Sequence, residues 1–285
     1  MPGAPPKAPA GGCPAIWFQI SKDLTGEFSD GGQCNDFARG AIRAVFHDCG
    51  AWKKSLGNNN NAGCDGSLFL AKEELSRPEN AGLTDIVPKL GALAQKYNVG
   101  VADFIQFAGA HAVKTCPLGP IVRIGVGRKD SSVANPPNLL PNPKASGDSI
   151  FQNFQDKGFS AVELAALIGA HTSAKQFVQD PSKAGTPLDT TPGTWDVAFY
   201  GQVLDKSAPF ILASDQALSQ QAQVGPAFKA FVNQQAGWNA AFAPAMNKLG
   251  LSGVDPASLV DCTAALPGGG PRKYMARRQE EGLLR

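Results

Sequence analysis

Six cysteines, spaced irregularly along a chain of 285 residues, limit how this sequence can fold more than any other feature. They are Cys13, Cys34, Cys49, Cys64, Cys116 and Cys262. No two of them form a Cys-x-x-Cys pair, so neither a zinc ribbon nor a thioredoxin-type redox site is expected. An even number of widely spaced cysteines favours long-range disulfide bonds in an extracellular protein. Six buried free thiols in a cytosolic protein are the alternative at this point.

The composition is that of a folded protein with a sizeable core. Hydrophobic residues make up 43% and charged residues 18%, which excludes a disordered chain. A net charge of +2 is too small to indicate a nucleic-acid partner. No run of about 18 apolar residues predicts a membrane-spanning helix. The opening letters, MPGAPP, lack the features of a signal peptide. The chain is therefore either cytosolic or a mature form with an added start methionine.

Apolar residues recur at helical rather than alternating spacing, which predicts a mainly α protein. We expect helices over residues 33–49, 83–97, 101–113, 148–157, 160–170, 195–203, 213–220 and 224–248. Residues 50–66 and 180–194 are predicted to be loops. Residues 116–148 are predicted to form a long ordered loop or two short strands, and long loops are usually functional. The tails, 1–12 and 267–285, are expected to be extended.

One pair of residues indicates acid–base chemistry. The chain has only three histidines, and Arg43 and His47 in the segment AIRAVFHDC are four residues apart. They therefore lie on one face of the expected helix. A neighbouring cation opposes protonation of an imidazole, so His47 would stay neutral and could act as a base. The alternative is a half-buried helix whose arginine only reaches toward solvent.

The other two histidines both follow the dipeptide Gly-Ala. His171 ends an apolar helix, and if it binds a metal its second ring nitrogen should contact a carboxylate. Asp215, in the segment LASD, is a candidate for that carboxylate. A core histidine and a helix-capping aspartate are the alternatives. His111 is followed by no acidic loop, so we assign it a structural or surface role.

Two loops are rich in oxygen ligands. The segment DGS at 65–67 comes shortly after Asp48, and DTTPGTWD at 189–196 combines carboxylates with hydroxyls. Hard oxygen donors of this kind suit Ca²⁺. Neither loop matches an EF-hand, and ordinary Asx and Ser/Thr turns are the alternative for each.

Taken together, these motifs resemble the plant/fungal/bacterial haem peroxidase superfamily, and most closely its secreted fungal class II. The resemblance covers about residues 34–262. Its motifs are RxxFHDC at 43–49, GCDGS at 63–67, DFIQFAG at 103–109, GAHT at 169–172, DTTPGTWD at 189–196 and SD at 214–215. Intracellular class I relatives usually carry tryptophan in place of Phe46 and lack the calcium loops.

The resemblance implies one mainly α domain over 1–285, with b-type haem between two lobes and little β structure. The distal lobe would span about 15–125 and the proximal lobe about 126–262. The reaction implied is reduction of hydrogen peroxide through a high-valent iron-oxo haem. Small phenolic or dye-like donors would then be oxidised by single-electron steps at the haem edge. The protein would be a secreted monomer whose signal peptide has been removed.

The resemblance also assigns roles to individual residues. His171 would be the axial ligand of the haem iron, and Asp215 would accept its ring N–H. His47 would be the distal base, Arg43 would stabilise charge on the leaving oxygen, and Asn80 would fix the tautomer of His47. Phe46 would flank them.

The family's calcium sites and disulfide bonds carry over as well. The distal calcium ligands would be Asp48, Gly63, Asp65 and Ser67. The proximal calcium ligands would be Thr172, Asp189, Thr191, Thr194 and Asp196. The disulfide pairs implied are Cys34–Cys116 and Cys13–Cys262, as in fungal members, and Cys49–Cys64, as in plant members.

The sequence departs from the ligninolytic and manganese-oxidising members. The three acidic positions of a manganese site are here Asp36, Gly40 and Phe177, so no Mn²⁺ site is expected. The position of a radical-forming surface tryptophan holds Ala166, and an aromatic position in the proximal calcium loop holds Leu188. These departures predict a generic peroxidase of low redox potential. A decayed homologue acting as a calcium-stabilised binding or scaffold protein is the alternative.

Overall fold

The computed structural model describes residues 12–56 and 63–269, and these are mainly helical, as predicted. Two-residue strands form three small antiparallel sheets. They pair β1 (Ser29–Asp30) with β2 (Gln33–Cys34), β3 (Gly125–Val126) with β6 (Val260–Asp261), and β4 (Lys175–Gln176) with β5 (Thr186–Pro187). Most of the expected tails, and residues 57–62 of the loop expected over 50–66, lie outside the described residues.

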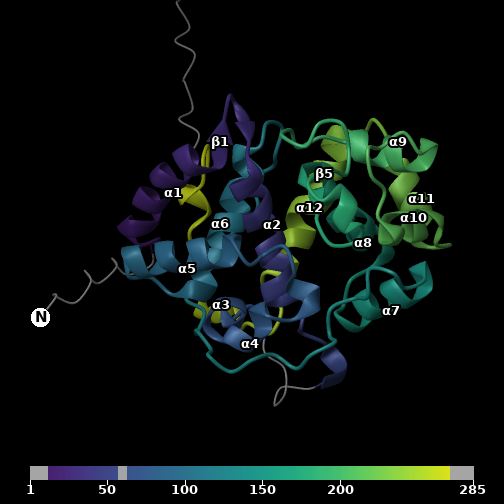
Figure 1. Ribbon diagram of the computed structural model, residues 1–285. Helices are drawn as coiled ribbons and strands as arrows, with labels where there is room; N and C mark the ends of the chain where they lie inside the picture. The colour runs from purple at the N-terminus through teal and green to yellow at the C-terminus, as the bar shows by residue number, and fades with distance from the viewer. Residues whose placement is uncertain (1–11, 57–62, 270–285) are drawn as a thin grey trace, which may run out of the picture.

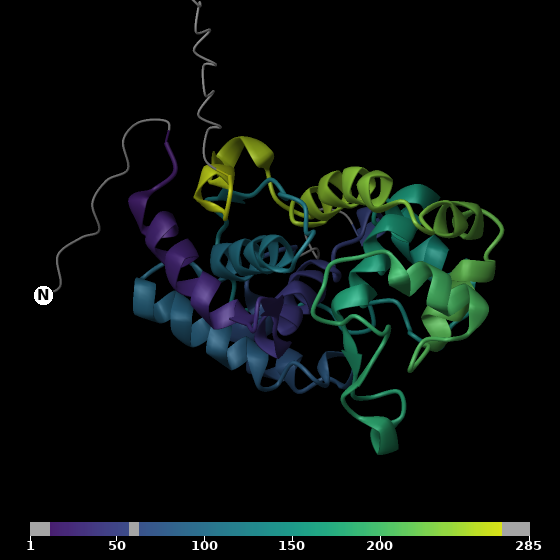
Figure 2. The same ribbon diagram turned by 90° about the horizontal axis from the view of Figure 1, so that it is seen from above.

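The helices fall into two groups that face each other (Figures 1 and 2). In Figure 1, α1 to α6 lie on one side and α7 to α11 on the other, with α12 between them. The helices are α1 (Ala15–Phe28), α2 (Asp36–Cys49), α3 (Ser67–Leu70), α4 (Lys72–Leu75), α5 (Ile86–Tyr97), α6 (Val101–Thr115), α7 (Gly147–Asp156), α8 (Ala161–Ile168), α9 (Ala198–Asp205), α10 (Ala213–Gln220), α11 (Val224–Ala230) and α12 (Gln235–Leu249). The division into lobes near residue 125 stays a prediction.

The packing of α2 against α6 forms the centre of the first group. Every residue of α6 from Val101 to Val113 is buried, so the helix is surrounded by protein, and its few polar side chains, Asp103, Gln106 and His111, form hydrogen bonds there. Gly109 brings the two helices together, because a Cβ there would lie 2.1 Å from Val45 Cγ2 and 3.2 Å from the carbonyl oxygen of Ala41. The backbone of α6 therefore rests directly on α2.

The structure near the N-terminus differs from the sequence predictions in two places. The sequence patterns did not predict α1, although its buried face includes Trp17 and Phe28. The helix expected from residue 33 begins at Asp36, because residues 33–34 pair with β1. The side chain of Asn35 accepts hydrogen bonds from the first-turn backbone N–H groups and so caps α2.

Two further helices differ from their predicted extents, one by a break and one by an earlier end. The helix predicted over 224–248 is broken into α11 and α12, and Asn233 between them has the left-handed φ of +58°. The helix predicted over 160–170 ends at Ile168, and the chain continues in a 3₁₀ turn, Gly169–Ser173. This turn carries His171. The change from α to 3₁₀ geometry matters because it sets the direction of that side chain.

Three disulfide bonds join the six cysteines in the pairs that the resemblance implies. Cys49–Cys64 holds the end of α2, and Cys34–Cys116 joins the start of α2 to the end of α6. Cys13–Cys262 links positions 249 residues apart. The backbone N–H of Cys262 also donates to the carbonyl oxygen of Ile124 at 2.8 Å, so the C-terminal segment returns to the first group of helices.

The contact at Gly109 yields a stability prediction. Gly109→Ala should lower the free energy of unfolding by about 1–3 kcal/mol, because the added methyl overpacks a filled interface. Gly26→Ala in α1 is the matched control, since a Cβ there meets no atom within 4 Å. It should be neutral or stabilise by about 0.5–1 kcal/mol. Urea unfolding of the two variants measures the difference. Equal stabilities would contradict the close approach of α2 and α6.

Candidate active site and metal sites

The first cluster of functional side chains lies on and beside α2. Arg43 Nε donates to His47 Nε2 at 3.1 Å, as expected for residues four apart on one helical face. Arg43 Nη2 donates to the carbonyl oxygen of Ala81 at 3.0 Å, which fixes the guanidinium. On the opposite side of the imidazole, His47 Nδ1 lies 2.7 Å from Asn80 Oδ1. The structure therefore brings Arg43, His47 and Asn80 together.

The hydrogen bonds define the tautomer of His47. Asn80 Nδ2 donates to the carbonyl oxygen of Glu74 at 2.7 Å, so Asn80 presents its oxygen to the imidazole. That oxygen accepts a proton-bearing Nδ1, and Nε2 is left as the acceptor of the Arg43 hydrogen bond. Nε2 is thus the basic nitrogen of this side chain.

Burial and charge both keep this imidazole neutral. Burial, followed by the positive charge of Arg43, lowers the pKa of His47 to about 3, although the hydrogen bond to Asn80 acts in the other direction. Burial lowers the pKa of Arg43 to about 10, so the guanidinium stays protonated near neutral pH. The pair combines a neutral base with a fixed cation.

Phe46 lies at the edge of this cluster. Its ring meets the His47 ring edge-on, with centroids 5.6 Å apart, and stacks on Phe154 of α7 at 5.9 Å. Phe46 therefore bridges the two groups of helices beside the distal histidine. The contact with α7 was not foreseen from the sequence.

The second cluster lies in the other group of helices. His171 Nδ1 is 2.9 Å from Asp215 Oδ1, which is fully buried and also accepts from Ser214 Oγ at 3.3 Å. Leu212, not Asp215, is the N-cap residue of α10, and no side-chain cap bond forms there. The capping alternative for Asp215 is therefore wrong. Because Nδ1 is engaged, Nε2 is the nitrogen of His171 available to a ligand.

The residues predicted as distal calcium ligands lie around the end of α2. Asp48 is fully buried, and Asp48 Oδ1 meets no hydrogen-bond partner among the described residues. Burial raises the pKa of Asp48 well above its usual value, and the neighbouring charge of Asp65 raises it further. Ser67 Oγ accepts from Asn135 Nδ2 at 3.0 Å. Gly63 packs against the carbonyl oxygen of Ser252, leaving no room for a side chain.

The residues predicted as proximal calcium ligands form a similar cluster beside His171. Thr172 Oγ1 lies 2.6 Å from Asp189 Oδ2 and 3.4 Å from Asp196 Oδ1. The backbone N–H of Thr191 donates to Asp189, whereas Thr191 Oγ1 is buried with no partner among the described residues. The backbone N–H of Thr194 donates to the carbonyl oxygen of Thr191 at 2.9 Å. Burial and the charge of Asp196 raise the pKa of Asp189 to about 6.

Each oxygen cluster contains two carboxylates. Over residues 12–56 and 63–269, no group of three or more His, Cys, Asp or Glu side chains could hold a metal ion. A cation at either cluster would therefore rely on hydroxyl and carbonyl oxygens as well as the carboxylates, a mixture that suits calcium rather than zinc. Such a cation would bind the buried oxygens that have no hydrogen-bond partner. Its charge would also lower the raised pKa values of Asp48 and Asp189 and so favour their ionised forms.

His111 takes no part in either cluster. It is fully buried, so a surface role is wrong, and Nε2 lies 2.8 Å from the carbonyl oxygen of Ser21 in α1. Nδ1 lies 3.1 Å from Thr115 Oγ1. Its role is to join α1 to α6.

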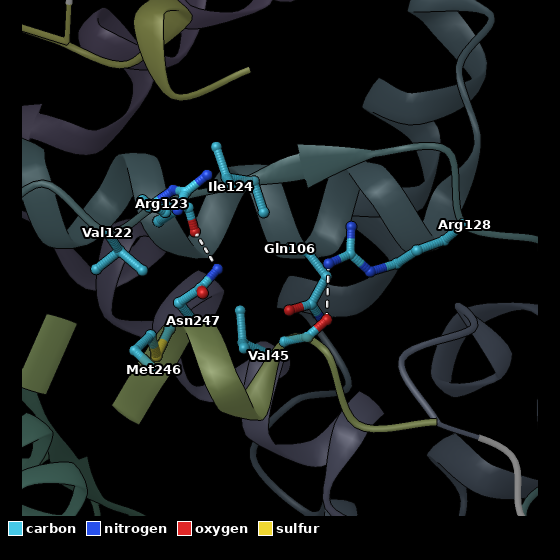
Figure 3. A pocket seen from close by; sticks show the side chains of 10 residues that line it. Val45, Gln106, Val122, Arg123, Ile124, Arg128, Met246 and Asn247 are labelled. Carbon is cyan, nitrogen blue, oxygen red and sulfur yellow. Dashed lines mark hydrogen bonds between the residues drawn. The ribbon is translucent and has the colours of Figure 1, made fainter. Parts of the chain in front are cut away.

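A small pocket elsewhere is likewise separate from the histidine clusters. It lies between α2, α6, α12 and the segment around β3, and Figure 3 shows Gln106, Arg128 and Asn247 among the side chains around it. Arg128 forms a buried ion pair with Asp103 at 3.0 Å and donates to the carbonyl oxygen of Gly250. These contacts brace the helices and place no base or nucleophile in the pocket.

Comparison with known proteins identifies the family. A family model described as peroxidase matches residues 20–234. The chain belongs to the peroxidase family. It is 34% identical over 270 residues to the low-redox potential peroxidase of Taiwanofungus camphoratus, covering 88% of this chain and 77% of that protein. It is 30% identical over 299 residues to the peroxidase of Arthromyces ramosus, covering 92% and 82%. It is 31% identical over 272 residues to manganese peroxidase 3 of Phlebia radiata, covering 87% and 75%.

The resemblance to fungal class II peroxidases is thereby confirmed, and the protein is a haem peroxidase. In the described part of this peroxidase, no helix combines the length and the apolar character needed to cross a membrane. Haem is implied by the family, and the residues of the two histidine clusters fit it. The His171 cluster offers an imidazole whose Nε2 can bind iron, and the His47 cluster offers a neutral base. The individual roles belong to the proposal below.

Sequence reasoning missed two residues that connect the distal base to the distal oxygen cluster. The carbonyl oxygen of Glu74 orients Asn80, and Glu74 Oε1 accepts from the backbone N–H of Asn135. Asn135 Nδ2 in turn donates to Ser67 Oγ. Glu74 lies in the short helix α4 and Asn135 in a distant loop, with no local sequence pattern that links them, so only the folded chain reveals the connection.

The charge of Arg43 leads to a pH prediction for this peroxidase. The neutral imidazole is the active form, so the rate of reaction with peroxide should fall on the acid side only as the pH approaches the His47 pKa of about 3. Arg43→Leu removes a positive charge, so the His47 pKa should rise and the acid limb should move to higher pH. The maximal rate should also drop by about 10²-fold or more. Stopped-flow rates across pH measure both effects.

Arg39→Leu is the control for that experiment, because Arg39 lies on the same helix but bonds Asp36 instead of His47. Its acid limb should match that of the unmodified protein. An unshifted limb in Arg43→Leu would contradict the electrostatic coupling.

Proposed function

We propose that this peroxidase is an extracellular enzyme that reduces hydrogen peroxide at haem b and oxidises small phenolic or dye-like donors in single-electron steps. The observation that carries the proposal is the neutral His47, whose tautomer is fixed by Asn80 and whose basic nitrogen faces a buried guanidinium. The bound haem supplies the two electrons that reduce peroxide to water and afterwards recovers them from donors.

On the distal side, the residues move one proton and stabilise one charge. His47 Nε2 would take a proton from one oxygen of hydrogen peroxide and return it to the other oxygen, which leaves as water. Arg43 would stabilise the negative charge that develops on the leaving oxygen. The bond from Arg43 to the carbonyl oxygen of Ala81 keeps the cation in position throughout.

On the proximal side, His171 would hold the iron through Nε2. Asp215 accepts the Nδ1–H bond from within a fully buried environment, where the carboxylate interacts strongly with the imidazole. This makes the imidazole electron-rich and a stronger donor to the metal. The buried oxygens of Asp48 and Thr191 support calcium at the distal and proximal clusters.

The donor specificity follows from three positions where manganese-oxidising relatives carry acids. Asp36 is engaged by Arg39 and by Lys175 Nζ at 2.9 Å. Gly40 packs against Ile86, where a Cβ would lie 2.6 Å from Ile86 Cγ1, and Phe177 is an exposed apolar side chain. These neighbours support the absence of a Mn²⁺ site.

The three disulfide bonds support an extracellular location. Bonds of this kind persist in oxidising compartments and are rare in the cytosol. The residue at the ligninolytic tryptophan position, Ala166, is fully buried, and so nearly is Leu188 in the proximal loop. Both are consistent with donors that react at the haem edge instead of at a surface tryptophan.

Purified protein loaded with haem tests this function directly. With peroxide, it should oxidise phenols such as guaiacol with saturation kinetics, and Mn²⁺ should give no saturable oxidation. His47→Ala should retain the haem spectrum but react with peroxide about 10²–10⁴-fold more slowly, because general base catalysis is lost. His111→Gln is the control and should keep the rate. An unchanged rate in His47→Ala would overturn the distal assignment.

Calcium removal should inactivate the enzyme although calcium touches no haem ligand directly. Chelation leaves Asp48 beside Asp65 and Asp189 beside Asp196 as uncompensated pairs, so both loops should spread and loosen the adjacent His47 and His171. We expect EDTA with mild heating to lower activity and shift the iron toward low spin, with Ca²⁺ restoring both. Protein shown by metal analysis to be calcium-free, yet fully active with an unchanged spectrum, would refute the calcium sites.

A further inference from the structure

Two buried tryptophans form a stacked pair behind the proximal histidine. Trp195 lies in the loop at 189–196 and Trp238 in α12, and both are fully buried. Their ring centroids are 4.9 Å apart, and their planes differ by 11°. Phe242 closes one side, with its centroid 4.7 Å from that of Trp195. No role in binding peroxide or donors requires such a pair.

Trp238 lies directly against the turn that carries His171. A Cβ at Gly169 would be 2.6 Å from Trp238 Nε1 and 2.7 Å from Trp238 Cε2, so only glycine allows the indole to approach this backbone. Gly169 begins the 3₁₀ turn in which His171 is the third residue. Trp238 Nε1 donates to the carbonyl oxygen of Ala166 at 2.9 Å, which fixes the ring. The indole is therefore held in contact with the segment that would hold the haem iron.

Aromatic contacts supply a second connection. The His171 ring lies 5.8 Å from that of Phe199, Phe199 lies 5.4 Å from Tyr200, and Tyr200 lies 5.9 Å from Trp238. The rings form a continuous buried series from the proximal imidazole to the tryptophan pair. Electron transfer through the protein is efficient where such contacts leave few gaps.

The hydrogen bonding of the pair favours a positive charge shared between the two rings. Trp195 Nε1 is buried and meets no acceptor within the described residues. An oxidised indole with no base at Nε1 keeps its proton, so the charge stays on the ring system and spreads over the stacked partner. The carbonyl dipole of Ala166 points its negative end at Trp238 Nε1. An unpartnered buried N–H of this kind is rare, and a redox role is one of the explanations for it.

We propose that the Trp195–Trp238 pair is an internal one-electron donor to the oxidised haem. The inference rests on the proposed function, because peroxide supplies the oxidising power. Reduction of one peroxide to two water molecules consumes two protons and takes two electrons from the haem site. One electron then passes from Trp238 to that site, leaving a radical cation shared with Trp195. A phenolic donor later returns one electron to the pair.

Tyr200 lies in the same series but does not hold the radical. A tyrosine loses its proton on oxidation, whereas Tyr200 Oη donates to the carbonyl oxygen of Ala165 at 2.8 Å, and a carbonyl is not a base for that proton. Burial also raises the pKa of Tyr200 well above its usual value. The tryptophan pair therefore provides the oxidisable site. Phe199 and Tyr200 connect it to His171 through ring contacts.

The experiment is freeze-quench EPR of haem-loaded protein mixed with peroxide and no reducing donor. The unmodified protein should give an organic radical signal that changes when its tryptophans are deuterated and not when its tyrosines are. Trp238→Phe should abolish the signal. Trp195→Phe should broaden the signal and shorten its lifetime, since the unpaired electron is no longer shared between two rings. Trp17→Phe is the matched control. Trp17 is also a buried tryptophan, but it lies in α1 and packs on Phe107 of α6. Its signal should be unchanged.

The outcomes separate this inference from the proposed function. If the haem absorption changes with peroxide but no tryptophan radical forms, or the radical survives in Trp238→Phe, the pair is not the donor and the peroxidase function stands. If peroxide leaves the haem absorption unchanged, both proposals fail. Isotope labelling uses the unmodified chain, so the test holds even where Trp238→Phe does not fold.

Discussion

The close packing of α2 on α6 is the constraint on which the distal site depends. Gly109 lets the two backbones meet, so one face of α2 is fixed along its length. Successive residues on a helix point about 100° apart. His47 is therefore directed to Arg43 and Asn80, while Asp48 is directed to the buried oxygen cluster. The next residue, Cys49, is bonded to Cys64. Three consecutive side chains are thus anchored in three different surroundings, and His47, the first of them, has little freedom.

Burial has opposite consequences for neighbouring residues of this helix. It disfavours whichever form of a side chain is charged. For His47 this yields the neutral imidazole that a base must have, and the nearby guanidinium adds to the effect. For Asp48 the same burial penalises the carboxylate, and Asp65 adds a like charge. A bound cation would resolve the second problem without disturbing the first. The helix can therefore carry a neutral base and a metal ligand side by side.

Sequence reasoning located the residues that stand in compact motifs and missed those that act across loops. Arg43 and His47 share a helical period, so their contact could be predicted from spacing alone. Glu74 and Asn135 could not, because their partners are chosen by the fold. The helix α1 was missed because Pro14 precedes it without any side-chain cap bond. The break between α11 and α12 depends on one left-handed residue, which apolar periodicity does not reveal.

The bond between Cys13 and Cys262 makes nearly the whole described chain into a covalent ring. The two cysteines are 249 residues apart, and both histidine clusters and both oxygen clusters lie between them. A single cut by a protease in any loop of this ring would leave one covalently connected molecule. The two fragments could not diffuse away from each other. Tolerance of a single cut is therefore a property of the chain's closure, independent of how stable any one loop is.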